Sequence, residues 1–244
     1  MDCPDRLAHG WHANRKWQTG WCRVMDPDRL LGYPVRRWTV TLGGRHLEIL
    51  GPADEDDLLD SPEVARRFEQ DEYLPYWGQL WPAAVMLAEE VLDDEPGRNR
   101  PALEIGCGLG LVAIAARLAG WDVLATDYDK DALGFTRENA RCNGVPSLPV
   151  KLVDWRRPRT LDRFDRLFAS DVLYEHRHQT QLADTINLLL AQDGLALVSD
   201  PNRKTAQGFE DALRHVGLAC RTSETHANQP HGRYVKGTIY RIWR

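Results

Sequence analysis

The sequence predicts an α/β fold with a doubly wound, largely parallel sheet, and two observations carry this prediction. From about residue 83 onward, short apolar runs alternate with segments of helical spacing, as in strands joined by crossover helices. One apolar run, Ala102–Ile105, leads through a glycine-rich turn into a helical segment, Leu111–Leu118. Such a turn between a strand and a helix is typical of nucleotide-type sites on open parallel sheets.

Length and composition limit the possible classes of protein. The chain has 244 residues, 43% of them hydrophobic, which suits one α/β domain with an N-terminal extension. Its formal net charge of -5 predicts no general affinity for nucleic acid. We expect no membrane span and no signal peptide, because no apolar run is long enough and the first residues lack a basic-then-apolar layout. Five cysteines without a C-x-x-C pair favour reduced thiols, so we expect a cytoplasmic protein.

The first 37 residues form a Trp/Arg-rich segment without sustained periodicity. We interpret this N-terminal segment, residues 1–37, as a tail that packs on the domain. A base-stacking or acidic-partner role is the alternative. The beginning of the chain is echoed at Met25, so a start of translation at Met25 is a further hypothesis.

Residues 38–75 are predicted to hold a hairpin and an acidic loop. Trp38–Leu42 and Arg45–Ile49 alternate apolar and polar residues around Gly43 and Gly44, which is typical of a two-residue turn. The acidic loop begins with Asp54–Asp57, and the charge stays negative through Glu69, Asp71 and Glu72. Acidic runs are usually solvated surface, but this one is also suited to attract a basic protein segment.

A third region, residues 76–244, is predicted to hold the catalytic domain and begins with a dense aromatic stretch. Pro82 stands where a helix over Ala83–Leu92 would begin, a position at which its missing N–H costs nothing. The glycine loop then offers Gly106, Gly108 and Gly110, which allow a sharp turn and close approach of a ligand. The next strand ends at Asp127, placed to accept hydrogen bonds from ribose hydroxyls.

Two residues of this loop argue against a dinucleotide. Leu111 stands where the dinucleotide fingerprint has its third glycine or alanine, and Glu104 would repel a pyrophosphate. The stretch resembles motif I of the class I (seven-strand) S-adenosylmethionine (SAM) methyltransferases. The resemblance implies that Gly106, Cys107, Gly108 and Gly110 pass the methionine moiety and that Asp127 holds the ribose. We expect Glu104 to contact the SAM amino group.

Later motifs sharpen the resemblance. Trp81 followed by Pro82 ahead of the glycine loop, and Asp171-x-x-Tyr174 after a strand over 164–170, resemble the protein-lysine methyltransferases related to the electron-transfer-flavoprotein and chaperone lysine methyltransferases. The resemblance implies a Rossmann-like seven-stranded sheet with an antiparallel last strand. It also implies that Trp81, Asp154 and Trp155 bind the cofactor. Tyr128, directly after Asp127, is placed to lie against the adenine, although it could equally be a surface tyrosine. We also expect Ser170 to bind the cofactor.

The chemistry of lysine methylation assigns the remaining roles. A lysine has an unperturbed pKa near 10.4 and must lose its proton before it can attack a methyl group. We expect Asp171 to bind the incoming amine and Tyr174 to orient it, as the two catalytic residues. His176 and His178 are possible general bases, although we expect both to be solvated. We expect no metal.

The rest of the chain completes the predicted sheet, and several functions remain open. Helices are expected over 129–142, 179–190 and 206–215, and strands over 148–153, 194–200, 218–225 and 234–243. The leading prediction is a SAM-dependent enzyme that methylates a lysine of a protein substrate. Alternatives on the same fold are a small-molecule N- or O-methyltransferase and an arginine or histidine protein methyltransferase. A SAM-binding regulator and an NAD-dependent oxidoreductase are more distant ones. The oligomeric state is not predicted.

Overall fold

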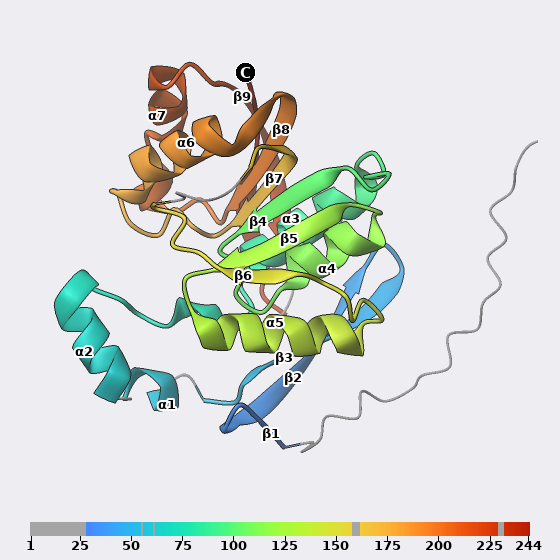
Figure 1. Cartoon of the computed structure of the whole chain (residues 1–244), viewed down its shortest axis with the longest axis vertical. Coiled ribbons are helices and arrows are strands. Elements are labelled where there is room, and N and C mark those ends of the chain that lie inside the picture. Colours follow the sequence, from blue (N-terminus) through green and yellow to red (C-terminus); the bar gives the residue numbers. More distant parts are fainter. Residues whose placement is uncertain (1–27, 55, 61, 158–161, 229–231) are drawn as a thin grey trace, which may run out of the picture.

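The protein is described here from a computed structural model (Figure 1). The structure describes residues 28–54, 56–60, 62–157, 162–228 and 232–244. Most of the Trp/Arg-rich segment, and with it Met25, lies outside these residues. All three predicted regions therefore remain predictions as divisions of the chain.

A seven-stranded sheet forms the centre of the fold, with strand order β6-β5-β4-β7-β8-β10-β9. All neighbouring pairs from β6 to β8 are parallel, and β10 is antiparallel to both β8 and β9. This confirms the predicted Rossmann-like sheet with an antiparallel last strand. The strands are β4 (Pro101–Ile105), β5 (Asp122–Asp127), β6 (Val150–Leu152), β7 (Phe164–Ser170), β8 (Leu190–Asp200), β9 (Ala219–Ala227) and β10 (Val235–Trp243).

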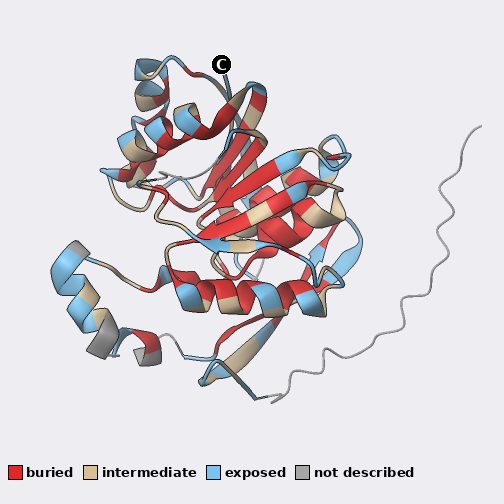
Figure 2. Ribbon diagram, viewed as in Figure 1, coloured by how far each residue is buried: buried red, intermediate tan, exposed pale blue. Residues whose placement is uncertain are grey.

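Helices cover both faces of the sheet and create two hydrophobic cores. Successive residues of a strand point to opposite faces. Accordingly, Ala102 packs in one core and Leu103 in the other. The first core lies under α3 (Pro82–Asp93), α4 (Leu111–Leu118) and α5 (Lys130–Cys142), and the second under α6 (His178–Leu189) and α7 (Phe209–His215). Figure 2 shows the central strands and α4 almost entirely buried. This packing holds the ends of the central strands in place.

The predicted hairpin is present and is longer than the sequence indicated. Its strands are β2 (Tyr33–Leu42) and β3 (Arg45–Pro52), and a short β1 (Arg29–Leu30) pairs with β2. Asn139 on α5 holds the hairpin: its side chain donates to the Leu50 carbonyl at 2.9 Å and accepts from the Leu50 N–H at 2.8 Å. The hairpin therefore packs on the same core as α3, α4 and α5.

The acidic segment 54–72 is helical over much of its length, which was not predicted from the sequence. It contains two helices, α1 (Asp56–Leu59) and α2 (Pro62–Asp71). α2 lies along one edge of the molecule in Figure 1, and Phe68 on it is 48% exposed. Charged residues outnumber apolar ones in this segment, so its hydrophobic periodicity is too sparse to identify a helix.

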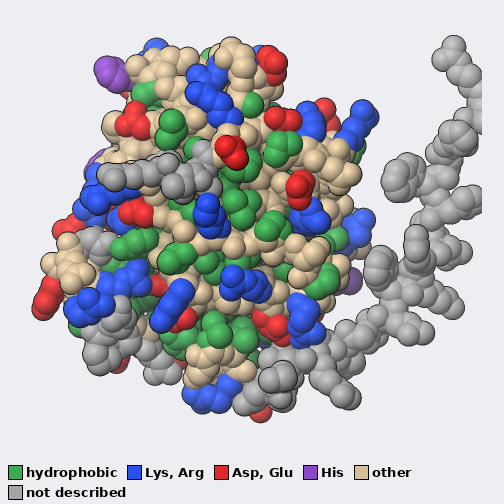
Figure 3. All heavy atoms as spheres, in the orientation of Figure 1, with side chains coloured by type: hydrophobic (Ala, Val, Ile, Leu, Met, Phe, Trp, Pro, Cys, Tyr) green, Lys and Arg blue, Asp and Glu red, His purple; other side chains and the backbone are tan. Residues whose placement is uncertain are grey.

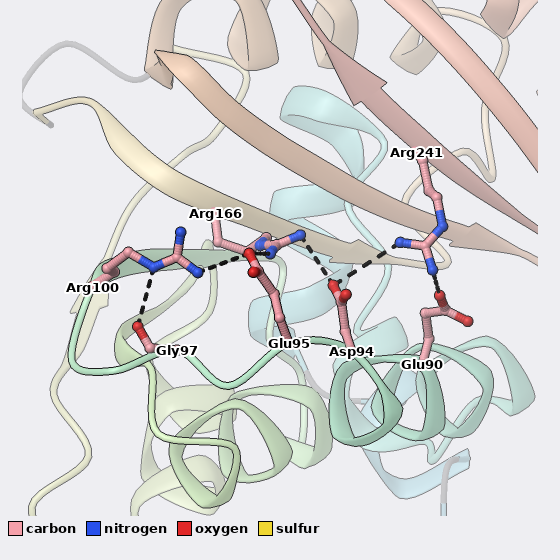
Figure 4. A network of polar contacts seen from close by, with 7 residues as sticks. All are labelled: Glu90, Asp94, Glu95, Gly97, Arg100, Arg166 and Arg241. Atoms are coloured by element: carbon pink, nitrogen blue, oxygen red, sulfur yellow. Dashed lines mark hydrogen bonds and ion pairs between the residues drawn. The ribbon is translucent and has the colours of Figure 1, made fainter. Parts of the chain in front are cut away.

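Buried charges tie the amino ends of the strands to the end of α3 (Figure 4). Arg166 on β7 is 3% exposed, and its guanidinium lies 3.1 Å from Asp94 and 3.2 Å from Glu95. Arg241 on β10 pairs with Glu90 in the same network. A buried charge is tolerated only when it is paired, so these contacts stabilise the end of the sheet opposite the carboxyl ends of the parallel strands.

The structure also bears on the predictions about membrane spans and cysteines. No helix in the described parts of the chain is both long and apolar enough to cross a membrane. Cys107 and Cys220 are free thiols, in line with the expectation of reduced cysteines.

Candidate functional site

A pocket opens at the carboxyl ends of β4, β5 and β7, where ligands bind on open parallel sheets. It brings together all but two of the predicted site residues. Those that line it are Trp81, Gly106, Cys107, Gly108, Gly110, Asp127, Tyr128, Trp155, Ser170, Asp171 and Tyr174. Glu104 and Asp154 do not line it.

The glycine loop forms the floor of the pocket between β4 and α4. Gly106, Gly108 and Gly110 have φ values of +69°, +51° and +84°, a region that L side chains rarely adopt. A Cβ on Gly110 would also lie 2.7 Å from the Thr136 side chain. The loop therefore requires glycine for its conformation, and at Gly110 also for space.

Asp127, at the end of β5, is held against this loop. Its two carboxylate oxygens accept the backbone N–H groups of Gly108 and Asp129, each at 2.9 Å. Burial raises the pKa of Asp127 to about 6, although these N–H groups favour the charged form. The Tyr128 N–H also donates to this carboxylate, and since a carboxylate offers about four lone pairs, it can still accept a hydrogen bond from a hydroxyl group of a ligand.

Glu104 lies behind the loop. It is 1% exposed, and its carboxyl accepts the backbone N–H of Ala113 on α4 at 2.8 Å. Desolvation raises its pKa well above the ordinary range. In this position Glu104 fixes the glycine loop to α4, and its predicted contact with a ligand amino group is not supported by the lining of the pocket.

Tyr128, Asp154 and Trp155 were expected to bind the adenine, and we call their part of the pocket the adenine end. The structure adds an arginine, Arg156, to this group. Tyr128 lines the pocket, and the Arg156 guanidinium lies 4.7 Å from the centre of its ring. Arg156 also pairs with Asp154, with nitrogen–oxygen distances of 2.7 and 3.2 Å. Asp154 therefore orients Arg156 at this edge. Sequence reasoning missed Arg156, although it directly follows the predicted Asp154-Trp155 pair.

Asp171 is buried at the opposite end of the pocket. Its side chain is 4% exposed, and it binds Arg203 through two contacts, at 2.5 and 3.0 Å. Its φ is +55°, a conformation that is unusual for a non-glycine residue. Arg203 comes from the turn after β8, some thirty residues later, and nothing in the local sequence signalled it.

Aromatic side chains surround the approach to Asp171. Tyr174 contacts Tyr76 edge to face, with ring centres 5.1 Å apart, and Tyr76 in turn lies 6.3 Å from Trp81. Burial raises the pKa of Tyr174, so its hydroxyl stays protonated at neutral pH. These rings form an apolar wall at this end of the pocket.

The expectation that both histidines are solvated was wrong for one of them. His176 is exposed, but His178 is 1% exposed at the start of α6. Its ring packs between Trp155 and Tyr174, at 5.3 and 4.6 Å between ring centres. Burial lowers its pKa, so the ring is neutral and supports the two aromatic residues from behind.

The segment after α2 forms one wall of the pocket, which the sequence did not indicate. Glu72, Tyr73 and Tyr76 line the cavity. Arg67 on α2 pairs with Asp129 at 2.9 Å, and the Tyr73 hydroxyl donates to the same carboxylate. Glu72 pairs with Arg177 at 3.0 Å on the other side. These polar contacts hold the wall in place from both sides.

The described residues contain no cluster of His, Cys, Asp or Glu side chains suited to a metal ion. The site is therefore built from glycines, carboxylates, arginines and aromatic rings. It combines a nucleotide-type end with an acceptor end that holds a buried carboxylate.

Comparisons with known proteins agree with this geometry. Residues 62–212 match a family profile described as lysine methyltransferase. The electron transfer flavoprotein beta subunit lysine methyltransferase of Danio rerio is 34% identical over 140 residues, covering 56% of this chain and 53% of that protein. Protein-lysine methyltransferase METTL21E of Mus musculus is 31% identical over 137 residues, covering 50% and 55%. The chain thus spans about half the length of these curated relatives.

Solved structures agree on the fold. A ribosomal protein L11 methylase from Lactobacillus delbrueckii subsp. bulgaricus aligns with a TM-score of 0.52 and 23% identity, covering 65% of this chain and 77% of that one. Since the matched profile includes the glycine loop, Asp127 and the Asp171-x-x-Tyr174 motif, it confirms the resemblance seen in the sequence. The chain belongs to the lysine methyltransferase family.

Proposed function

We propose that this protein transfers a methyl group from SAM to the side-chain nitrogen of a lysine in a protein substrate. One observation carries the proposal: a single pocket joins the glycine loop and Asp127 to Asp171 and Tyr174. The first pair suits a nucleoside with an amino-acid tail, and the second suits an amine. Membership of the lysine methyltransferase family supports the same conclusion.

The residues present fit SAM. Asp127 has a free lone pair for a ribose hydroxyl, and Gly106 and Gly108 leave room for a ligand to approach the backbone. Tyr128 and Trp155 offer rings at the adenine end. Trp81 and Ser170 line the same pocket. Arg156, already stacked on Tyr128, is suited to cover the base.

When bound, SAM supplies an activated methyl group on a sulfonium, and the reactive chemistry belongs to it. The chain has to hold the acceptor nitrogen in line and free of its proton. Asp171 accepts a hydrogen bond from the amine, and the protonated hydroxyl of Tyr174 orients it. Tyr76 and Trp81 exclude water from the approach. Holding two reactants in a productive geometry supplies up to roughly 7–11 kcal/mol of the barrier in favourable systems.

The substrate is proposed to be a protein segment that carries a lysine among basic residues. Exposed acids of the α1–α2 region, Asp60 and Glu69, would attract such a segment. On the face seen in Figure 3, Lys and Arg side chains lie among Asp and Glu side chains. A cytoplasmic location is part of the proposal, and the free thiols of Cys107 and Cys220 favour it.

The test uses methyl-labelled SAM and a lysate of the source organism that lacks the gene. Products are separated by size, and the Tyr174→Phe variant serves as the control because it keeps the ring and removes only the hydroxyl. We expect label in one protein band with the native enzyme and little with the variant. Label confined to small molecules would contradict the protein substrate while leaving the cofactor site in place.

A further inference from the structure

The acceptor end of the pocket contains a complete ion pair before any substrate enters. Both oxygens of Asp171 contact the Arg203 guanidinium, at 2.5 and 3.0 Å, and the Asp171 side chain is 4% exposed. The same guanidinium lies 5.4 Å from the centre of the Trp81 ring. Arg203 is thus fixed between the carboxylate and an aromatic wall of the pocket, although it does not line the pocket itself.

We infer that Arg203 is a positioning residue that cancels the charge of Asp171, so that the site accepts the acceptor lysine as a neutral amine. This inference rests on the proposed function. It adds a role for a residue outside the Asp171-x-x-Tyr174 motif.

The inference resolves a conflict in the acceptor site. A buried carboxylate without a partner binds an ammonium group strongly, and an opposite charge within about 4–6 Å stabilises the charged form by about 1–3 pKa units. Such a carboxylate would hold the substrate lysine in the form that cannot attack. With Arg203 in place, Asp171 still has two lone pairs for an amine N–H, because a carboxylate offers about four. It can orient the amine without favouring its proton.

Other charged groups around the pair do not replace this function. The Arg203 N–H donates to Asp200, at the end of β8, at 2.7 Å, and burial raises the pKa of Asp200 to about 6. The remaining titratable groups near the acceptor end come from several other segments, and they are Tyr76, Asp127, Arg156, Tyr174, Glu175, Arg177 and His178. Among the described residues, only Arg203 makes a charged contact with both oxygens of Asp171.

The test compares Arg203→Gln with Arg203→Lys. Glutamine keeps a hydrogen-bond donor but removes the charge, and lysine keeps the charge. The rate of label transfer from SAM into the protein fraction of the gene-lacking lysate is measured from about pH 6.5 to about pH 9.5, with the enzyme in excess so that the acceptor is fully bound and the pH profile reports groups of the bound complex. For Arg203→Gln we expect the midpoint of the acidic limb to rise by about one pH unit or more, with a loss of about tenfold at neutral pH that is largely recovered at high pH. For Arg203→Lys we expect the midpoint of the native enzyme.

A double variant, Asp171→Asn with Arg203→Gln, separates charge from structure. It lacks both charges, so its midpoint should return to that of the native enzyme even if its rate is low. A loss of activity that is uniform across pH in Arg203→Gln would overturn the inference and leave Arg203 a structural role only. If the native enzyme labels no protein at any pH, the proposed function is wrong. That result is distinct from a failure of the Arg203 inference, because it does not involve the variants.

Discussion

Asn139 joins three parts of the fold to the site, and its removal is the sharpest structural test. Its side chain is fully buried and makes three hydrogen bonds, two to the backbone of Leu50 on the hairpin and one to the Leu109 carbonyl in the glycine loop. The substitution Asn139→Ala removes all three and leaves one buried N–H and two buried carbonyls without these partners. We therefore expect both the hairpin and the glycine loop to loosen.

The magnitude follows from burial. A buried donor or acceptor left without a partner costs about 1–3 kcal/mol, and a carbonyl that keeps a second contact lies at the low end. Three such groups predict a loss of about 3–5 kcal/mol in the free energy of unfolding. This is a large fraction of the 5–15 kcal/mol that is typical of a domain. Since Leu109 belongs to the loop, we also expect SAM to bind several-fold more weakly.

The chain offers a matched control one helical turn later. Asn143 also makes three hydrogen bonds, two with the Glu48 backbone and one with the Asn139 carbonyl, but it is only partly buried and does not touch the loop. For Asn143→Ala we expect a loss of about 1–2 kcal/mol, because water can reach the exposed groups. Urea denaturation measures both losses and calorimetry measures SAM binding. Equal losses in the two variants, with unchanged SAM affinity in both, would refute the reasoning.

Three further predictions concern charge and the acceptor end. The pKa of Asp127 is about 6 in the folded state against about 3.8 unfolded, so its contribution to stability is lost as pH rises through this window. As the pH rises from about 4 to about 7, the free energy of unfolding of Asp127→Asn should therefore increase by up to about 3 kcal/mol relative to that of the native protein, as urea denaturation would measure. A difference between the two proteins that does not change with pH would contradict the raised pKa. Arg166→Met should lower the free energy of unfolding by no more than about 1 kcal/mol, because the acids that remain, Asp94 and Glu95, are 21% and 60% exposed and can be solvated; it should leave SAM affinity unchanged, as calorimetry would check. Tyr174→Phe should lower turnover at least tenfold while SAM affinity stays within about twofold, and a parallel loss of both would place Tyr174 at the cofactor instead.

Local patterns were sufficient for most of the sheet and for the cofactor end. The strand–glycine–helix pattern around Gly106 and the acid at Asp127 are close in sequence to the structures they form, and both lie where they were expected. Asp171 and Tyr174 were placed through a motif that follows a strand. Because the carboxyl ends of parallel strands meet at one edge, each of these signals predicted a neighbour in space.

Contacts between segments that are distant in the chain could not be predicted from the sequence. Arg203 reaches Asp171 only because β7 and β8 are adjacent, and Asn139 finds Leu50 only because the hairpin folds onto α5. Glu104 was expected to bind the ligand because of its residue type and position, but its carboxylate accepts a hydrogen bond from a backbone N–H of α4. Burial of His178 likewise depends on Trp155, which comes from another loop. None of these pairings has a local pattern.

The most direct measurement of the central claim is the identity of the methylated side chain. Protein labelled by the native enzyme is hydrolysed in acid, and the labelled amino acid is separated from the methylated forms of arginine and histidine. The account predicts label in methylated lysine, absent when Tyr174→Phe replaces the native enzyme. Label in methylated arginine or histidine would contradict lysine as the acceptor, and with it the need for a neutral amine beside Asp171 and Arg203.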